Sequence, residues 1–168
     1  AAGSNFPLVT GDTVFVQTGT YTVTAITPIA SLFLKASGGM VTVDGTGGAG
    51  GSDIFTALPG VTHFDGFIAA NAVDDGFLWA SSGQTFSRCG AQSCGGDGWD
   101  QPHSTAGINM ILCYARACGG SGFRNTSGLM TQSAFCEAGD NTGSGFVLGI
   151  AGSKCSNCLS YDNGADGF

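Results

Sequence analysis

The chain has 168 residues, enough for one domain and too few for a second domain with its own core. Only 10 % of the residues are charged, against about a quarter in a typical soluble domain, while 30 residues are glycine. Five lysines and arginines face twelve acidic residues, so the net charge is −7 and no basic stripe can neutralise a phosphate backbone. No apolar run reaches the roughly eighteen residues that span a bilayer. These properties argue against nucleic-acid binding and against a membrane-spanning protein.

The N-terminal part of the chain, as far as Asp65, contains short strand-like runs separated by glycine, proline or serine. The runs are Val14-Phe15-Val16, Tyr21-Thr22-Val23, Leu32-Phe33-Leu34 and Met40-Val41-Thr42-Val43. β-branched and aromatic residues bounded by turn formers are typical of strands. The segment from Gly45 to Ser52 consists of Gly, Ala, Ser and Thr, and we expect a loop there. Residues 1–65 are therefore predicted to form the opening coils and a loop of a single domain.

A regular repeat follows, marked by a glycine and then an aromatic residue. The aromatic positions are Phe77, Trp99, Phe123, Phe146 and Phe168, and the steps between them are nearly equal. Counting back ten residues from the last four aromatics gives Cys89, Cys113, Cys136 and Cys158. Counting back five gives Cys94, Cys118, Asn141 and Asn163. Four of the seven cysteines thus share one position in the repeat, which indicates a structural unit of nearly constant length.

A period of roughly 22–24 residues without heptads suits either a leucine-rich horseshoe or a β-helix. The Leu-x-x-Leu-x-Leu pattern of the horseshoe is missing. Helix is disfavoured because glycine recurs throughout, and each interior glycine costs about 1 kcal/mol relative to alanine. We therefore predict an all-β fold, a single-domain right-handed parallel β-helix over residues 1–168 with regular coils over 66–168. Roughly six or seven coils fit the length.

Coils that stack about 4.8 Å apart place equivalent residues in ladders along the solenoid. We expect Cys89, Cys113, Cys136 and Cys158 to line the lumen as one column. Their thiols are predicted to stay reduced, because parallel stacked side chains do not readily reach the disulfide dihedral of about 90°. A second ladder is predicted from Cys94, Cys118, Asn141 and Asn163, and an aromatic ladder from Phe77, Trp99, Phe123, Phe146 and Phe168.

With this period, the chain resembles the right-handed parallel β-helix superfamily that includes pectate lyases, galacturonan hydrolases and phage tailspikes. The segment Gly11–Tyr21 is similar to the family's first coil, G-D-x-V-x-x-x-x-G-x-Y, and Asn157–Phe168 is similar to its coil consensus. Within the superfamily the chain looks most like a small tailspike-like capsid decoration, or cement, protein of a tailed phage. The resemblance is specific for the fold and weak for function, since this scaffold carries several chemistries.

Carboxylates and arginines offer little support for an enzyme. Asp74-Asp75 resembles the paired-Asp step of galacturonan hydrolases, but the accompanying N-T-D, G-H-G and R-I-K elements are not found. Adjacent aspartates before Gly-Phe are more often turn formers. The three arginines Arg88, Arg116 and Arg124 match no lyase motif, and we expect them to form surface or interface pairs. No catalytic residue is therefore assigned.

Metal and cofactor motifs are also weak. Gly95–Asp100 matches the opening of the calcium-binding nonapeptide G-G-x-G-x-D, but it stands alone, and we expect a glycine turn. Cys155 and Cys158 have C-x-x-C spacing, yet both fall in predicted ladders and are expected to fill space in the lumen. His63 and His103 lie nearly two coils apart, so neither a zinc site nor a catalytic triad is predicted. We expect no cofactor and no bound metal.

The leading hypothesis is a virion structural protein, a homotrimeric decoration protein that binds the major capsid protein and stabilises the phage head. Scarce charge favours it, because lateral faces with few charges are covered when copies associate. The alternative is a glycan-binding or glycan-degrading β-helix, located on a phage tail or outside the cell, in which Trp79, Trp99 and Tyr114 are the candidates to stack on sugars. Of these, Trp99 belongs to the aromatic ladder, and we expect it to pack structurally instead. A third reading takes the chain as a fragment, since Phe168 falls at a coil boundary.

Overall fold

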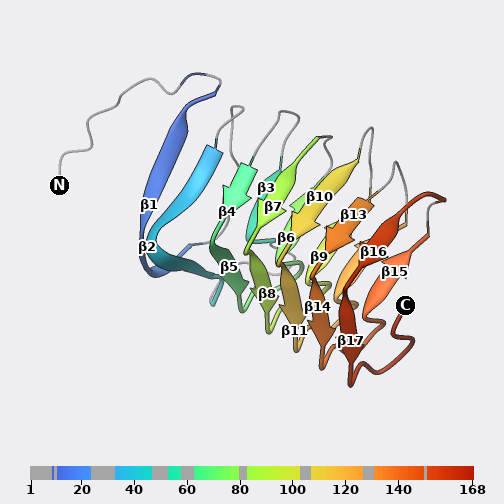
Figure 1. Ribbon diagram of the computed structural model, residues 1–168. Helices are drawn as coiled ribbons and strands as arrows, with labels where there is room; N and C mark the ends of the chain where they lie inside the picture. The colour runs from blue at the N-terminus through green and yellow to red at the C-terminus, as the bar shows by residue number, and fades with distance from the viewer. Residues whose placement is uncertain are drawn as a thin grey trace.

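In the computed structural model the chain winds into a parallel β-helix whose coils follow one another from β1 at one end to β17 at the other (Figure 1). The structure describes residues 9, 11–23, 33–46, 53–57, 63–79, 83–102, 107–126, 131–149 and 151–168. Within these ranges every regular element is a strand and every strand pairing is parallel. The predicted all-β, single-domain parallel β-helix is confirmed. The described ranges hold no helix with the length and apolar character of a membrane span.

Each coil contributes strands to three faces. Two long strands open the solenoid, β1 (Thr13–Thr22) and β2 (Phe33–Asp44). The first face then holds β4 (His63–Asp65), β7 (Thr85–Ser87), β10 (Ile108–Ile111), β13 (Thr131–Ala134) and β16 (Lys154–Ser156). The second face holds β5 (Phe67–Ala70), β8 (Gly90–Gln92), β11 (Tyr114–Arg116), β14 (Glu137–Gly139) and β17 (Leu159–Tyr161). The third face holds β3 (Phe55–Ala57), β6 (Phe77–Trp79), β9 (Trp99–Gln101), β12 (Phe123–Asn125) and β15 (Phe146–Leu148).

The opening strands are longer than the sequence runs suggested. Runs that were predicted to be separate lie within single strands, and β2 pairs with β4 through its first half and with β5 through its second. The backbone turns the corner at Gly38 and Gly39, whose φ angles are +86° and +152°. Glycine adopts these angles without the Cβ clash that other residues suffer. Pairing with β1 therefore resumes after a register shift, and the strand is not broken. Of the predicted loop at 45–52, residues 47–52 lie outside the described residues.

Strand pairing repeats with the predicted period. Phe77 pairs with Trp99, Trp99 with Phe123, and Phe123 with Phe146, so each pairing joins aromatic positions of successive repeats. The third face holds five strands, and the solenoid makes about five turns, fewer than the six or seven expected. The count is lower because neither β1 nor the last coil adds a strand to the third face within the described residues.

The core is the lumen of the solenoid. Side chains alternate along each strand, so that one residue points inward and the next outward, as in the buried-exposed-buried-exposed pattern of β10. The largest fully buried side chains are aromatic and belong to the first and third faces: Phe55, Phe64, Phe77, Trp79, Phe86, Trp99, Phe123 and Phe146. Rings from the two faces also meet edge to face, as Phe86 and Trp99 do at 5.1 Å between centroids.

Two corners of each coil use the left-handed backbone conformation. The first corner joins the first and second faces, at Gly66, Arg88, Leu112, Phe135 and Asn157. The second corner follows the second face, at Asn71, Ser93, Ala117, Asp140 and Asp162. Backbone N–H groups at both corners donate to the next coil, for example Leu112 N to Ala134 O at 3.0 Å and Ser93 N to Arg116 O at 3.0 Å. The chain therefore turns sharply without interrupting the hydrogen-bonded ladder.

Candidate functional site

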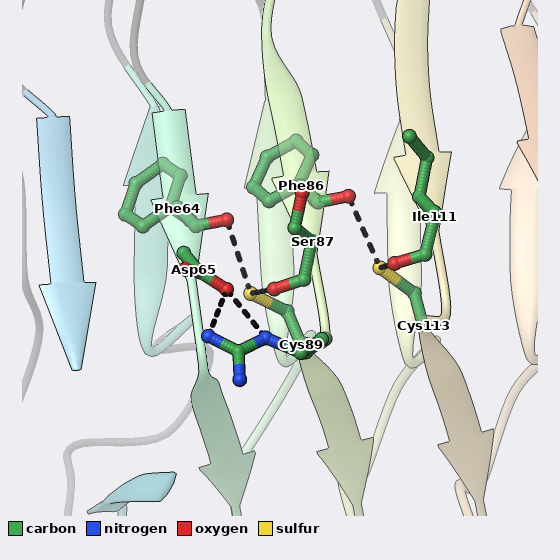
Figure 2. A network of polar contacts seen from close by, with 8 residues as sticks. Phe64, Asp65, Phe86, Ser87, Cys89, Ile111 and Cys113 are labelled. Atoms are coloured by element: carbon green, nitrogen blue, oxygen red, sulfur yellow. Dashed lines mark hydrogen bonds and ion pairs between the residues drawn. The ribbon is translucent and has the colours of Figure 1, made fainter. Parts of the chain in front are cut away.

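The cysteine column lies just inside the first corner. Cys89, Cys113 and Cys136 are at most 1 % exposed, Cys158 is partly buried, and all are free thiols. Each Sγ contacts two carbonyl oxygens, one two residues earlier and one in the preceding coil, as Figure 2 shows for Cys89 with Ser87 O and Phe64 O. Burial raises the pKa of the Cys89 thiol to about 12. The thiol is therefore protonated at neutral pH and is a poor nucleophile.

The second ladder lies just inside the second corner. Asn141 Nδ2 donates to Asn163 Oδ1 at 2.9 Å and to Ala115 O at 3.2 Å, while Asn141 Oδ1 accepts from Cys118 N at 3.1 Å. Cys94 and Cys118 occupy the same position in earlier coils and are buried. One amide of this kind satisfies backbone groups from neighbouring coils, which stabilises the stacking.

The aromatic ladder runs along the third face. Its rings stack nearly parallel, with interplanar angles from 2° to 10°. Trp79 and Trp99 are 2 % and 0 % exposed, so neither can stack on a sugar as the glycan alternative suggested. The prediction failed for Trp79 because it sits two residues beyond Phe77 on β6 and therefore points to the same side of the strand, into the lumen.

A column of aspartates precedes the third face. Asp53 Oδ1 accepts a hydrogen bond from Asp75 N at 3.2 Å, Asp75 Oδ1 accepts from Asp97 N at 2.6 Å, and Asp97 Oδ1 accepts from Ser121 N. The carboxylate of one coil thus accepts a hydrogen bond from a backbone N–H of the next coil. Gly96 has no room for a side chain, because a Cβ there would collide with the carboxylates of the preceding coil.

Asp53, Asp74 and Asp75 form a group of carboxylates in the described part of the chain, with one oxygen from each within 4.8 Å of the others. Burial, together with the charges of Asp100, Asp74 and Asp97, raises the pKa of Asp75 to about 7. Three carboxylate oxygens are ligands that a divalent cation prefers. Asp53 and Asp75, however, already accept backbone hydrogen bonds, so the group is accounted for as part of the coil-stacking column. Asp74 is the exposed member.

The glycine-rich segment Gly95–Asp100 forms a turn that is closed by an arginine. Arg124 Nη1 lies 3.3 Å from Asp97 Oδ2 and 3.8 Å from Asp100 Oδ1. Arg88 pairs with Asp65 at 2.7 Å, and the Arg116 Nε donates to Glu137 Oε1 at 2.9 Å. All three arginines therefore pair with carboxylates one coil away.

Cys155 and Cys158 occupy neighbouring columns and not a separate centre. Cys155 pairs in register with Ser133, and Cys158 Sγ contacts Ser133 O at 3.5 Å. Burial raises the pKa of Cys155 to about 12. His63 lies on β4 with its ring 6.0 Å from that of Phe33, and His103 lies outside the described residues.

The outer side of the second face carries a tyrosine platform that sequence reasoning identified only in part. It consists of Tyr114, Arg116, Glu137 and Tyr161. The two rings lie over Gly90 and Gly139, where an added Cβ would collide with them. The Arg116 guanidinium lies 5.5 Å from the Tyr114 ring centroid, and Glu137 Oε1 accepts from the hydroxyl of Tyr161 at 2.5 Å. In the sequence, the feature that could have indicated this platform is a glycine at the position equivalent to each tyrosine one coil earlier, namely Gly90 for Tyr114 and Gly139 for Tyr161.

No protein-family model, no curated protein and no solved structure matches the chain. The strand pairing establishes the parallel β-helix.

Proposed function

We propose that this chain is a structural protein of a tailed-phage virion, a trimeric decoration or cement protein that stabilises the head. The observation that carries the proposal is an unbroken ring stack that runs through the lumen and continues to the exposed ring of Phe168. Neighbouring rings lie 3.9 to 5.8 Å apart between centroids along Phe55, Phe77, Trp99, Phe123, Phe146 and Phe168. One ring per coil ties each turn to the next, and close packing of this kind gives a stiff rod.

The polar groups of the coils support the same proposal. Asp75 and Asn141 are hydrogen-bonded to the backbone of neighbouring coils, and Cys113 Sγ contacts the Phe86 and Ile111 carbonyls. Side chains that hold the coils together in this way suit a mechanical role better than a chemical one. The charged side chains of Arg88 and Arg116 are likewise paired across coils.

The proposal is tested on virions. Antibody labelling and cryo-electron microscopy should locate the protein on the head surface in contact with the major capsid protein. Heads that lack the protein should release their DNA at a lower temperature, and adding the purified protein back should restore the loss. Label at the tail tip would instead support a spike, and a monodisperse monomer that does not bind heads would contradict the proposal.

We also propose that the chain has no polysaccharide lyase or hydrolase activity. Incubation with pectins and host-envelope glycans should yield neither unsaturated products nor new reducing ends. Robust turnover that disappears in Asp74→Asn or Asp75→Asn would overturn the structural proposal and assign catalysis to the carboxylate group.

A second candidate function, glycan binding without cleavage, is favoured by the tyrosine platform. Sugar rings stack on partly exposed aromatic rings, and Arg116 and Glu137 between the two tyrosines offer hydrogen-bond partners. Titration calorimetry with host-envelope polysaccharide tests it. Binding should be lost in Tyr114→Ala and Tyr161→Ala and kept in Tyr21→Ala, a matched change of the 41 % exposed tyrosine on β1. Equal binding by all three variants would exclude the platform.

A further inference from the structure

Two amide side chains are buried in the lumen on the inner side of the third face. Gln101 on β9 and Asn125 on β12 pair in register, and Leu148 on β15 follows them in the same column. Gln101 is 0 % and Asn125 3 % exposed. Because the column accepts an aliphatic side chain at Leu148, filling the lumen does not by itself require an amide at this position.

One hydroxyl group serves both amides and leaves one polar atom of each unpaired. Thr131 Oγ1 donates to Gln101 Oε1 at 3.0 Å and accepts from Asn125 Nδ2 at 2.7 Å. Gln101 Nε2, Asn125 Oδ1 and also Trp79 Nε1 are buried and have no hydrogen-bond partner among the described residues. Buried polar atoms of folded proteins almost always have a partner, and that partner is often an ordered water molecule.

The side chains that carry these three atoms line one small cavity. Its lining includes Trp79, Gln101, Asn125 and Thr131, and its volume is about 10 Å³, the room that a single water molecule needs. Two of the unpaired atoms belong to N–H donors and one is a carbonyl acceptor. A cation is repelled by the donors and an anion by the carbonyl oxygen, whereas water both accepts and donates hydrogen bonds.

We infer that this cavity binds one water molecule, which links β6, β9 and β12 in three successive coils. The water accepts hydrogen bonds from Trp79 Nε1 and Gln101 Nε2 and donates one to Asn125 Oδ1. It thereby joins neighbouring coils at the third face, as the Asn141 side chain does at the second corner. Because the three atoms are shielded from bulk solvent, the water exchanges only when the lumen opens. The inference concerns the interior of the solenoid and does not depend on the proposed head function.

The two tryptophans provide the test and its internal control. Both line the cavity, but Trp99 Nε1 already donates to Tyr114 O at 3.0 Å. In isotope-labelled protein, the indole proton of Trp79 should show a nuclear Overhauser cross-peak at the water frequency, with the sign that a long-lived water gives. The Trp99 proton should show no comparable cross-peak. Spectra of Trp79→Phe and Trp99→Phe assign the two indole signals.

A variant that fills the cavity should remove the water. Asn125→Leu copies the residue that the next coil carries in this column, so the Trp79 cross-peak should disappear. Magnetic relaxation dispersion of the solvent should then count one long-lived water fewer than in the parent. Ser133→Ala is the matched control, because Ser133 is buried on β13 but lies outside the cavity lining found among the described residues. It should keep both the cross-peak and the count.

The outcomes that overturn the inference are defined first on the parent protein. A parent without a water cross-peak at Trp79 has a dry cavity, and this result does not require any variant to fold. Equal cross-peaks at both tryptophans would show that solvent enters by general opening of the lumen and not by binding at this site. A cross-peak that survives in Asn125→Leu, once circular dichroism shows that this variant is folded, also contradicts the assignment. None of these results bears on the location of the protein on virions, so the two proposals fail separately.

Discussion

The two corners of the coil share a backbone conformation and differ in chemistry. At the second corner most left-handed positions hold short polar residues such as Asn71, Ser93 and Asp140. At the first corner two of the equivalent positions hold Leu112 and Phe135. Because φ is between 49° and 58° at the non-glycine residues of both corners, backbone preference alone does not explain the difference. The second corner therefore holds residue types that suit the left-handed conformation, whereas the first corner holds two that do not.

The corners also differ on their inner sides. Inside the first corner each coil from β7 onward contributes a cysteine, whose thiol contacts carbonyl oxygens as Figure 2 shows for Cys113. Inside the second corner the thiols of Cys94 and Cys118 give way to Asn141 and Asn163, whose amides also accept backbone N–H groups. The thiols therefore stabilise the first corner mainly by filling space. In the later coils of the second corner, the asparagines stabilise it by hydrogen bonding.

The largest effect is expected from a charge placed inside the first corner. Cys113→Lys should prevent folding, because burying an unpaired ammonium costs more than the roughly 5 to 15 kcal/mol that stabilise a domain. Leu112→Lys, one residue away and directed outward, should fold. Soluble yield and far-ultraviolet circular dichroism check both variants. A folded Cys113→Lys protein would show that the side chain can leave the lumen and that the column is not part of a close-packed core.

The next effect concerns the aspartate column that follows the second corner. Asp75 has a pKa of about 7 in the folded chain against an ordinary value of 3.8, chiefly because it is buried. The folded state therefore binds this proton more tightly than the unfolded state. Its stabilising contribution is complete below about pH 4 and is lost as the pH rises through about 7, so the free energy of unfolding should fall by about 3 kcal/mol between these limits.

Asp75→Asn should remove most of this pH dependence. The amide keeps an oxygen for the Asp97 N–H and carries no charge, so urea unfolding at about pH 8 should be shifted to higher denaturant. Asp166→Asn, at the equivalent position in the last coil and exposed, is the control and should change little. Burial also raises the pKa of Asp53 and Asp100, so a weaker dependence of the same sign should remain. A parent protein that is more stable at about pH 8 than at about pH 5 would contradict the assignment.

Alanine substitutions compare the inner sides directly. Asn141→Ala should lower the free energy of unfolding by about 2 to 3 kcal/mol, because it leaves the buried Cys118 N–H and Ala115 carbonyl without this partner. Cys113→Ala removes only a sulfur and should lower it by about 1 to 2 kcal/mol through a small cavity. Chemical denaturation of both variants measures the difference. Equal losses would mean that the asparagine acts as a space filler like the thiol.

Much of the fold could be predicted because equivalent residues recur in the sequence at a nearly constant spacing. Cys89, Cys113 and Cys136 precede their aromatics by the same ten residues, and the structure places them in one column. The sequence did not predict that the short runs join into two long strands, β1 and β2. A glycine pair such as Gly38-Gly39 in β2 can either end a strand or bend it. The number of turns was overestimated because dividing length by period assumes that every stretch of chain adds a strand to each face, which neither β1 nor the last coil does on the third face within the described residues.

The candidate surfaces were harder to predict than the lumen. Trp79 was a candidate sugar platform because aromatic residues are common in glycan sites, but strand alternation buries it. Trp99, which was expected to pack in the aromatic ladder, is buried as well. Tyr161 was overlooked because its role depends on Gly139 one coil earlier, a contact that requires the register. The exposed side chains of Leu112 and Phe135 were overlooked for a different reason. Each residue immediately precedes a column cysteine, and a large apolar residue there is expected to belong to a strand. Only its φ angle shows that it lies at a corner.

The smallest effect is expected from exchanging residues between the corners, and it tests the comparison most directly. Leu112→Asn should raise the free energy of unfolding of the monomer by about 0.5 to 1 kcal/mol, because asparagine tolerates a left-handed φ better than leucine. Asp140→Leu, the reciprocal change at the second corner of the next coil, should lower it by a similar amount. Urea unfolding of the parent and both variants, each at low protein concentration, measures the difference. If leucine is equally stable at both corners, backbone strain is not what distinguishes them.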